Sequence, residues 1–319
     1  MLPIENFNSG LLEILACPRC KGALEAALPF ECKSCGLQFP IVGGVPVFLN
    51  EANSLFEFKD FTQQRDTTYN TSVPKWKRFA KKFIPSISLN IKAPRNFQNF
   101  LARLGAENSR PCLLVVGGAV AGQGFDAAAM PKEMLLVETD VAFGERTDLI
   151  CDAHDLPFQS ATFDGVIIQA VLEHVLDPFA CVAEIHRVLK TGGAVYAETP
   201  FMQQVHAGRF DFMRFTHLGH RRLFRSFEEI ESGAVCGAGM ALAWSYCYFL
   251  SSFFTNRTLQ QIAFAFGSLT SFWLKYFDYF LIDRPGSYDA ASGFYFWGRK
   301  AEEFLPDKKL IAEYKGAIQ

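Results

Sequence analysis

The stretch from residue 112 to residue 140 most constrains what this chain can fold into. Residues 112–116 (CLLVV) form an uninterrupted apolar run that ends in a cluster of small residues, beginning with Gly117 and Gly118. Such a run is typical of a buried parallel strand that turns tightly into a helix beside a bound cofactor. Glycine is needed there because a Cβ atom would block the ligand or the turn. The sequence therefore predicts a cofactor site at the end of a buried strand.

Carboxylates follow the next apolar run in the chain. Residues 134–137 (MLLV) lead into Glu138 and Asp140, which places two acids at the carboxyl end of the expected second strand. Acids in that position hydrogen-bond ribose hydroxyls, although a carboxylate can also simply cap the following turn. Only residues 141–151 separate Asp140 from Asp152, so a helix between the second and third strands must be very short or missing.

Several motifs then follow in a fixed order: residues 152–158 (DAHDLPF), 163–168 (FDGVII), 172–175 (LEHV), 184–190 (EIHRVLK) and 192–193 (GG). Together with the glycine cluster, these motifs strongly resemble the class I S-adenosylmethionine-dependent methyltransferases that carry D-x-x-x-LPF, FD-x-V, LEHV-x-DP and E-x-x-RVLK-x-GG. The resemblance covers residues 111–231, with residues 292–300 as a further segment. It implies an α/β fold, a doubly wound Rossmann-like methyltransferase sheet with the cofactor across the carboxyl ends of the strands.

Two further elements are expected within this region. Apolar residues at spacings of three to four predict a helix over residues 178–190, ended by Gly192 and Gly193. Residues 293–300 (GFYFWGRK) are expected to form a last strand, antiparallel beside the sixth.

The resemblance also implies a set of residues that contact S-adenosylmethionine. Asp140 corresponds best to the ribose-binding carboxylate and Glu138 second best, while Asp152 corresponds to the acceptor for the adenine amino group. The full predicted set is Gly117, Gly118, Gly122, Asp140, Glu138, Asp152, Ala153 and Gln169. Val115 is a departure from the family, which has an acidic residue two positions before its first glycine.

Candidate catalytic residues lie on the carboxyl side of the fourth and fifth strands. By resemblance, Glu173 and His174 lie near the site of methyl transfer; for His174 a packing role is the alternative. Residues 201–222 combine aromatic, His and Arg side chains with one Asp, which favours a lid that binds the acceptor. His206 and Asp211 are its candidate general bases, against a purely structural role.

Four of the nine cysteines form two Cys-x2-Cys pairs, separated by residues 21–31. Cys17, Cys20, Cys32 and Cys35 can close four thiolates around one Zn²⁺ ion. Residues 11–49 also resemble the small zinc-ribbon protein that activates several methyltransferases by docking on them. The other cysteines are scattered singly, which is typical of a reduced, cytosolic protein.

The length of 319 residues suggests about two domains. We expect a zinc ribbon over residues 1–55, a basic linker with helices over 56–108 and a methyltransferase domain over 109–302. An apolar helical insertion over 241–285 and a polar tail over 303–319 complete the prediction. The linker is basic and free of acids from residue 67 to residue 106, which suits an anionic surface or substrate, although a solvated linker face explains it equally well.

Residues 241–282 are rich in Phe, Trp and Tyr and nearly free of charge. Each apolar piece is shorter than the roughly 20 residues that a membrane-spanning helix needs. We expect a helical hairpin lying in a membrane interface; the surface of a homodimer and ordinary core are the alternatives. With no secretory signal visible, the sequence favours a cytoplasmic protein, peripheral to the inner face of the membrane.

The expected function is methyl transfer from S-adenosylmethionine to a small-molecule or lipid-linked glycan acceptor. An RNA methyltransferase is the nearest alternative, but the formal charge of −2 disfavours nucleic acid as a partner. A non-catalytic scaffold is the alternative from another class, and Val115 in place of an acid is its motivating feature.

Overall fold

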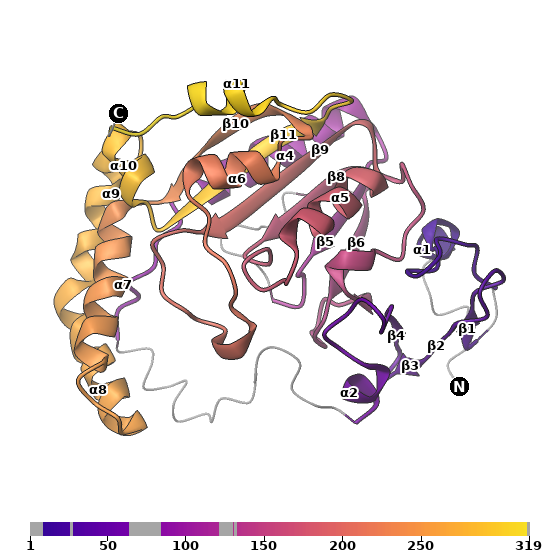
Figure 1. The fold of residues 1–319 in the computed structure, drawn as a ribbon, viewed down its shortest axis with the longest axis horizontal. Helices are drawn as coiled ribbons and strands as arrows, with labels where there is room; N and C mark the ends of the chain where they lie inside the picture. The colour runs from indigo at the N-terminus through magenta and orange to yellow at the C-terminus, as the bar shows by residue number, and fades with distance from the viewer. Residues whose placement is uncertain (1–8, 26–27, 64–83, 121–129, 131–132, 318–319) are drawn as a thin grey trace.

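The computed structural model describes residues 9–25, 28–63, 84–120, 130 and 133–317. Nine strands form one sheet in the order β10-β11-β9-β8-β5-β6-β7-β4-β3 (Figure 1). Their bounds are Ile41–Val42 (β3), Val45–Phe48 (β4), Cys112–Val116 (β5), Leu135–Asp140 (β6), Leu149–Cys151 (β7), Phe163–Gln169 (β8), Leu189–Pro200 (β9), Phe227–Cys236 (β10) and Gly293–Lys300 (β11).

The strands from β4 to β9 pair in parallel, and β11 pairs antiparallel with both β9 and β10. The order runs outward from β5 in both directions, so the predicted doubly wound sheet with an antiparallel last strand is confirmed. No helix lies between β6 and β7, all of whose connecting residues are described, as the short spacing from Asp140 to Asp152 predicted.

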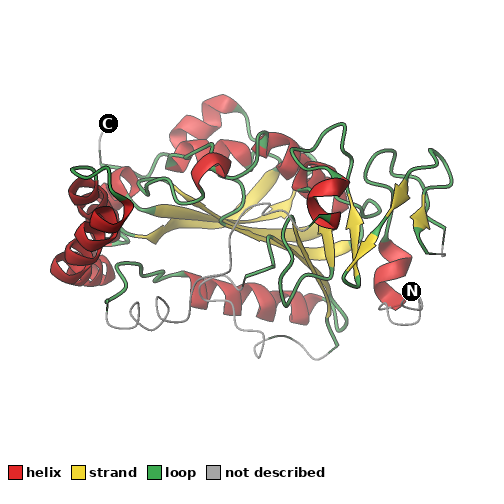
Figure 2. Ribbon diagram, turned by 90° about the horizontal axis from the view of Figure 1, so that it is seen from below, coloured by secondary structure: helices red, strands yellow, loops and turns green. Residues whose placement is uncertain are grey.

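Helices cover both faces of this sheet, which Figure 2 shows edge-on between two helical layers. On one face lies α4 (Ala93–Glu107), and on the other lie α5 (Pro178–Val188) and α6 (His217–Leu223). Successive residues of β5 point to opposite faces. Leu113 and Val115 pack with Phe97 of α4, whereas Leu114 and Val116 belong to the cluster that contains Ile185 of α5. This double burial explains why β5 is apolar throughout.

Helix α5 begins where the sequence predicts and ends earlier. Asp177 caps it by accepting hydrogen bonds from the backbone N–H groups of Phe179 and Ala180. The backbone becomes extended at Leu189, which pairs with Phe163 of β8. The prediction that Gly192 and Gly193 end the helix is therefore wrong, because both glycines lie inside β9.

The cysteine-bearing segment is built onto the edge of the sheet. It contains α1 (Ser9–Ile14), the hairpin of β1 (Phe30–Glu31) with β2 (Gln38–Phe39), and β3 with β4. Strand β4 pairs in parallel with β7, through Val47 opposite Ile150 and Phe48 opposite Cys151. A short helix, α2 (Phe58–Thr62), follows. Since the ribbon shares a sheet with the following domain, the division at residue 55 stays a prediction.

The predicted helical hairpin is present at the opposite end of the molecule from the ribbon (Figure 1). It comprises α7 (Ala238–Ser251), α8 (Arg257–Ser271), a 3₁₀ segment η5 (Phe272–Phe277) and α9 (Asp278–Leu281). Asp278, which is fully buried, accepts hydrogen bonds from the backbone N–H groups of Gly239 (2.7 Å) and Met240 (2.9 Å). This contact ties the end of the hairpin to its beginning at the positive N-terminus of α7.

The outer side of the hairpin is strongly apolar and exposed. Its exposed large apolar side chains are Leu242, Phe249, Phe253, Phe254, Leu259, Ile262, Phe266, Leu269, Trp273, Tyr276, Phe277, Tyr279, Phe280 and Leu281. Among the described residues, no helix has the length and hydropathy required to cross a membrane. The chain ends its described part with α10 (Pro285–Ala290), β11 and α11 (Asp307–Ala312).

Candidate functional site

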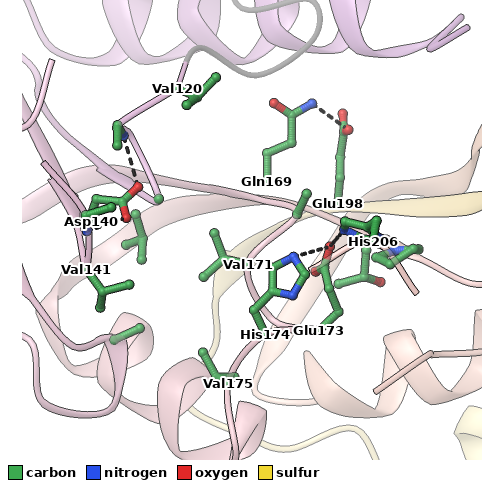
Figure 3. A pocket seen from close by; sticks show the side chains of 18 of the residues that line it. Val120, Asp140, Val141, Gln169, Val171, Glu173, His174, Val175, Glu198 and His206 are labelled. Atoms are coloured by element: carbon green, nitrogen blue, oxygen red, sulfur yellow. Dashed lines mark hydrogen bonds and ion pairs between the residues drawn. The ribbon is translucent and has the colours of Figure 1, made fainter. Parts of the chain in front are cut away.

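A cavity of about 850 Å³ opens at the carboxyl ends of β5, β6, β8 and β9. Residues that follow the strands on both sides of β5 line its wall, together with residues of the segment after the ribbon. Figure 3 shows Asp140 on one side, Gln169 and Glu198 on the other, and Glu173, His174 and His206 together at one wall. The cavity therefore lies where doubly wound sheets bind their ligands.

The turn after β5 is fixed by backbone hydrogen bonds to the neighbouring strand. Gly117 has φ +82°, and a Cβ atom on it would lie 2.3 Å from a methyl carbon of Val171. The N–H groups of Gly117 and Gly118 donate to the carbonyl of Thr139 at 2.8 and 2.9 Å. Gly117 lines the cavity, whereas Gly118 packs against Glu138 beside it. Gly122 lies outside the described residues.

Asp140 and Glu138 point to different places, although both belong to the end of β6. Asp140 lines the cavity and accepts hydrogen bonds from the backbone N–H groups of Ala119 and Ala142, each at 3.0 Å. Burial raises the pKa of Asp140 above its ordinary value. Glu138 is bound to the guanidinium of Arg146 and does not line the cavity. The geometry thus agrees with the preference for Asp140.

Asp152 and Ala153 line the cavity beyond Asp140. The carboxylate of Asp152 accepts hydrogen bonds from the backbone and Nδ1 of His154 (3.0 and 2.6 Å) and from the hydroxyl of Ser54 (2.6 Å). Burial alone would raise the pKa of Asp152, but these hydrogen bonds outweigh it and lower that pKa. Ser54 comes from the segment that follows the ribbon.

The same segment places Leu55 and Phe56 in the wall of the cavity. Asn50 and Asn53 anchor it by donating to Asp155 at 2.9 and 2.8 Å. No local sequence pattern indicates this wall, because its residues are polar or apolar loop residues without a motif. Only the pairing of β4 with β7 brings them to the site.

Gln169, at the end of β8, joins a buried polar group. Its amide donates to Glu198 at 2.7 Å, and Glu198 also accepts from the hydroxyl of Tyr196 (2.6 Å) and the amide of Asn90 (2.9 Å). Burial raises the pKa of Glu198 despite these hydrogen bonds. Sequence reasoning missed Glu198 and Asn90. The position of Glu198 near the end of a buried strand is the signal that could have indicated it.

Glu173, His174 and His206 meet at the far wall of the cavity, although His206 comes from the loop after β9. Oε1 of Glu173 lies 3.6 Å from Nε2 of His174 and 3.7 Å from Nε2 of His206. Glu173 is fully buried. Its proximity raises the pKa of His206 above the ordinary value for imidazole. The structure thus brings together two predicted catalytic residues and Glu173, which the resemblance places near the transfer site without a catalytic role.

Asp211 contacts His206 from outside the cavity. It is bound to the guanidinium of Arg214 and accepts a hydrogen bond from the backbone of His206 at 2.9 Å. The hydrogen bonds from Arg214 and His206 overcome the effect of burial and hold the pKa of Asp211 far below its usual range. A carboxylate in this state is a weak base and does not line the cavity. Its contacts suit a role in shaping the loop that carries His206.

The four ribbon cysteines also lie together. Sγ of Cys17 is 3.7 Å from Sγ of Cys35, and Sγ of Cys20 is 3.4 Å from Sγ of Cys32. One ligand atom from each of the four lies within 4.8 Å of all the others. Tetrahedral thiolates at about 2.3 Å from one Zn²⁺ ion would be about 3.8 Å apart, so the set fits that ion closely.

The carboxyl ends of a doubly wound parallel sheet are the place where α/β proteins of this architecture bind nucleotide-type cofactors. Residues 128–197 match the family described as "Methyltransferase domain", and residues 8–44 match the family described as "Trm112p-like protein". The chain therefore contains a segment similar to a methyltransferase domain, preceded by a Trm112p-like segment.

Sequence relatives match separate parts of the chain. A UPF0434 protein of Shewanella denitrificans is 51% identical over 53 residues, which are 15% of this chain and 95% of the relative. The ubiquinone/menaquinone biosynthesis C-methyltransferase UbiE of Desulfotalea psychrophila is 46% identical over 44 residues, 14% of this chain and 18% of the relative.

Solved structures with partial similarity include phosphoethanolamine N-methyltransferase 2 of Haemonchus contortus with S-adenosyl-L-methionine. It has a TM-score of 0.43 and 17% identity, over 78% of this chain and 61% of that chain. A complex of the Haloferax volcanii Trm112 methyltransferase activator with a methyltransferase has a TM-score of 0.40 and 17% identity, over 66% of this chain and 92% of that chain.

Replacement of Gly117 by alanine tests the turn that opens the cavity. The variant Gly117→Ala should unfold at lower denaturant than Gly192→Ala, because both sites have positive φ but only the first Cβ meets a neighbouring atom. We expect about 1 kcal/mol of destabilisation for Gly192→Ala from backbone strain, and about 2–4 kcal/mol for Gly117→Ala. Chemical unfolding measures both. Equal losses would show that Val171 does not confine the turn, and a partial recovery in Gly117→Ala/Val171→Ala would show that it does.

Proposed function

We propose that this enzyme transfers the methyl group of S-adenosylmethionine to a small-molecule acceptor inside the cavity. The observation that carries the proposal is the separation of polar groups along one cavity. Asp140 lies on one side of the cavity, Glu173, His174 and His206 lie together at another wall (Figure 3), and Asp152 also lines the cavity. A long cofactor held at Asp140 would present its methyl group to an acceptor held at that other wall.

Asp140 and Asp152 supply the contacts that an adenosine needs. In the proposal, Asp140 accepts hydrogen bonds from the ribose hydroxyls, while Asp152 accepts one from the adenine amino group and Ala153 flanks the ring. Gly117 gives the ligand close access to the backbone. Gly118 and Glu138 would support the turn from behind, and Gly122 stays a prediction from the sequence.

The amino-acid end of the cofactor would lie near Gln169 and Glu198. Val115, which stands where the family has an acid, points into the apolar layer under α4 and cannot contact a ligand in the cavity through a polar atom. Glu198 lines the cavity and is buried, so it is the carboxylate that we propose in place of the missing acid.

Methyl transfer from a sulfonium is an in-line displacement, in which the enzyme mainly aligns the reactants and excludes water. The bond between sulfur and the methyl carbon breaks as the acceptor's oxygen, nitrogen or carbon bonds to that carbon, and S-adenosylhomocysteine leaves. An oxygen or nitrogen acceptor also loses a proton. His206, with Glu173 and His174 beside it, occupies the wall where that proton would leave.

Calorimetry with S-adenosylmethionine and S-adenosylhomocysteine tests the cofactor half directly. We expect saturable binding of both, with about one site per chain and weaker binding after Asp140→Asn. No heat of binding at millimolar ligand would favour the non-catalytic scaffold.

Substitution of His206 tests the acceptor half. The variant His206→Ala should keep its affinity for S-adenosylmethionine and lose about tenfold or more in turnover, because the side chain lies at the far wall from the adenosine contacts. His186→Ala is the control, since His186 contacts the carbonyl of Ala301 and does not line the cavity. Turnover is measured as radioactive methyl incorporated into a lipid and metabolite extract of the host. Unchanged turnover in His206→Ala would remove His206 from the catalytic group.

We further propose that Cys17, Cys20, Cys32 and Cys35 bind one Zn²⁺ ion. The ion would hold the two turns of the ribbon together. Backbone and side-chain contacts then dock the ribbon on the methyltransferase sheet: Ala16 donates to the carbonyl of Pro157 at 2.9 Å, and Lys21 pairs with Glu184 at 2.8 Å. The role assigned to the metal is structural.

Loss of one ribbon thiolate should therefore release zinc and destabilise the docked segment. Cys20→Ser is expected to lower the zinc content by about one equivalent per chain and the melting temperature by about 5 °C or more. Cys236→Ser, outside the cluster, should retain full zinc. Elemental analysis and thermal unfolding provide the two measurements. A zinc content unaffected by Cys20→Ser would contradict the assignment.

The apolar hairpin leads us to propose that the acceptor is lipid-linked and is met at a membrane surface. Met240 of α7 lines the cavity, so the hairpin borders the acceptor's wall. Its outer side carries Trp273, Tyr276 and Tyr279 among its exposed apolar residues. Aromatic side chains with a polar tip are typical of helices that lie in a bilayer interface.

Vesicle binding tests this surface. The variants Phe253→Glu and Phe280→Glu should each reduce sedimentation with phosphatidylglycerol vesicles by about tenfold, because a buried Phe contributes about 1.5–3 kcal/mol. Ile311→Glu is the matched control, being 70% exposed but located in α11. The alternative result is that the wild-type protein does not bind vesicles and sediments as a dimer, which Phe253→Glu dissociates. That result would show that the apolar face is the interface of a homodimer.

A further inference from the structure

The three side chains at the far wall of the cavity have the composition of a metal site. Glu173 and His174 follow β8, and His206 follows β9, so the site is assembled from two loops. A carboxylate oxygen and one nitrogen from each imidazole lie within 4.8 Å of one another. Figure 3 shows the three side chains converging on the cavity wall.

The carboxylate of Glu173 lacks the partners that its burial demands. The side chain has no solvent exposure, and neither of its oxygens has a hydrogen-bond partner among the residues that the structure describes. An ionised carboxylate in such a place is strongly unfavourable unless a positive charge compensates it. The nearest nitrogens, at 3.6 and 3.7 Å, are beyond hydrogen-bond distance.

The hydrogen bonds of the two imidazoles determine which nitrogens face Glu173. Nδ1 of His174 lies 2.8 Å from the carbonyl of Phe210, and Nδ1 of His206 lies 3.3 Å from the carbonyl of Gln204. A carbonyl only accepts, so Nδ1 carries the proton in both rings. In neutral imidazoles, both Nε2 atoms then carry a lone pair, and both lie near the same carboxylate oxygen.

Three electron-rich atoms around one point repel one another unless a cation lies between them. The outer contacts also have the form that metal-binding histidines adopt, in which the second ring nitrogen donates to a carbonyl or carboxylate. The carbonyls of Phe210 and Gln204 are such acceptors, and Oδ2 of Asp211 lies 3.5 Å from Nδ1 of His206.

We propose that Glu173, His174 and His206 bind one divalent transition-metal ion. Two imidazoles and one carboxylate are a set used by Zn²⁺, Mn²⁺ and Fe²⁺. Ligand atoms at about 2.1 Å from an ion are about 3.0–3.6 Å apart, for angles between 90° and 120°. The distance of 3.6 Å from Oε1 to His174 already lies in that range, and the distance of 3.7 Å to His206 exceeds it by only about 0.1 Å.

Three protein ligands leave at least one coordination position open toward the cavity. A donor atom of the acceptor bound there would be held in place and made more acidic by the ion. This consequence rests on the proposed methyl transfer, whereas the binding of the ion does not.

Manganese binding to the full-length, zinc-loaded protein tests the site apart from the ribbon, because Mn²⁺ prefers nitrogen and oxygen ligands to thiolates. Electron paramagnetic resonance counts free and bound Mn²⁺. We expect one bound ion per wild-type chain, and binding weakened by at least about tenfold in His206→Ala and in Glu173→Gln. His186→Ala and Cys20→Ser should retain the ion. Thermal unfolding shows which variants are folded, and the half-buried position of His206 makes its variant the decisive one if Glu173→Gln fails to fold.

Two outcomes would overturn the proposal: no bound Mn²⁺, Zn²⁺ or Fe²⁺ beyond the ribbon's equivalent at millimolar metal, or equal binding in His206→Ala. Its failure is distinguishable from failure of the proposed function. Methyl transfer without a second metal would leave the enzyme assignment intact and assign the compensating charge to a protonated His206. Binding of a second metal by a protein that binds no S-adenosylmethionine would support the metal site and contradict the proposed methyl transfer.

Discussion

The hydrogen bonds between the turn after β5 and the end of β6 are the contacts on which the cavity depends. The carbonyl of Thr139 accepts from two consecutive glycine N–H groups, and the carboxylate of Asp140 accepts from the next N–H, that of Ala119. These bonds fix the backbone where a ligand must approach it. They also keep Asp140 at the cavity wall, because the parallel register places Val116 opposite Thr139. One pair of strands thus positions both the open turn and the proposed ribose acceptor.

The Trm112p-like segment extends the sheet at the edge formed by β7. Strand β7 has only three residues, and no helix follows β6, so this edge of the sheet would otherwise be short and poorly covered. Strand β4 pairs with β7 and extends the sheet, after which Ser54 reaches Asp152. Because the ribbon and the sheet on which it packs belong to one chain, each copy of the sheet has its own ribbon. The segment therefore extends from the four clustered cysteines to the wall of the cavity.

The sequence was informative wherever the signal is local. The apolar runs of β5 and β6, the glycine at positive φ and the paired cysteines each depend on neighbours in the chain, so the doubly wound sheet and the cysteine cluster could be predicted. The end of α5 could not, because Leu189 leaves the helix to pair with Phe163, and Gly192 then lies within a strand. The resemblance placed Glu173 near the transfer site, but its contact with His206 could not be predicted, since His206 comes from another loop.

The hairpin and the acceptor's wall share one loop. The hydroxyl of Tyr248 donates to the carbonyl of Val205 at 2.6 Å, and the amide of Gln204 donates to the hydroxyl of Ser245 at 3.0 Å. Both contacts join α7 to residues directly before His206, and Arg214 holds the same loop from its other side through the carbonyl of Gln203 at 2.7 Å. Contacts with α7 therefore help to position the loop that carries the imidazole of His206. Because α7 presents an apolar outer side, the surface proposed to meet the lipid and the group proposed to meet the acceptor belong to one packed unit.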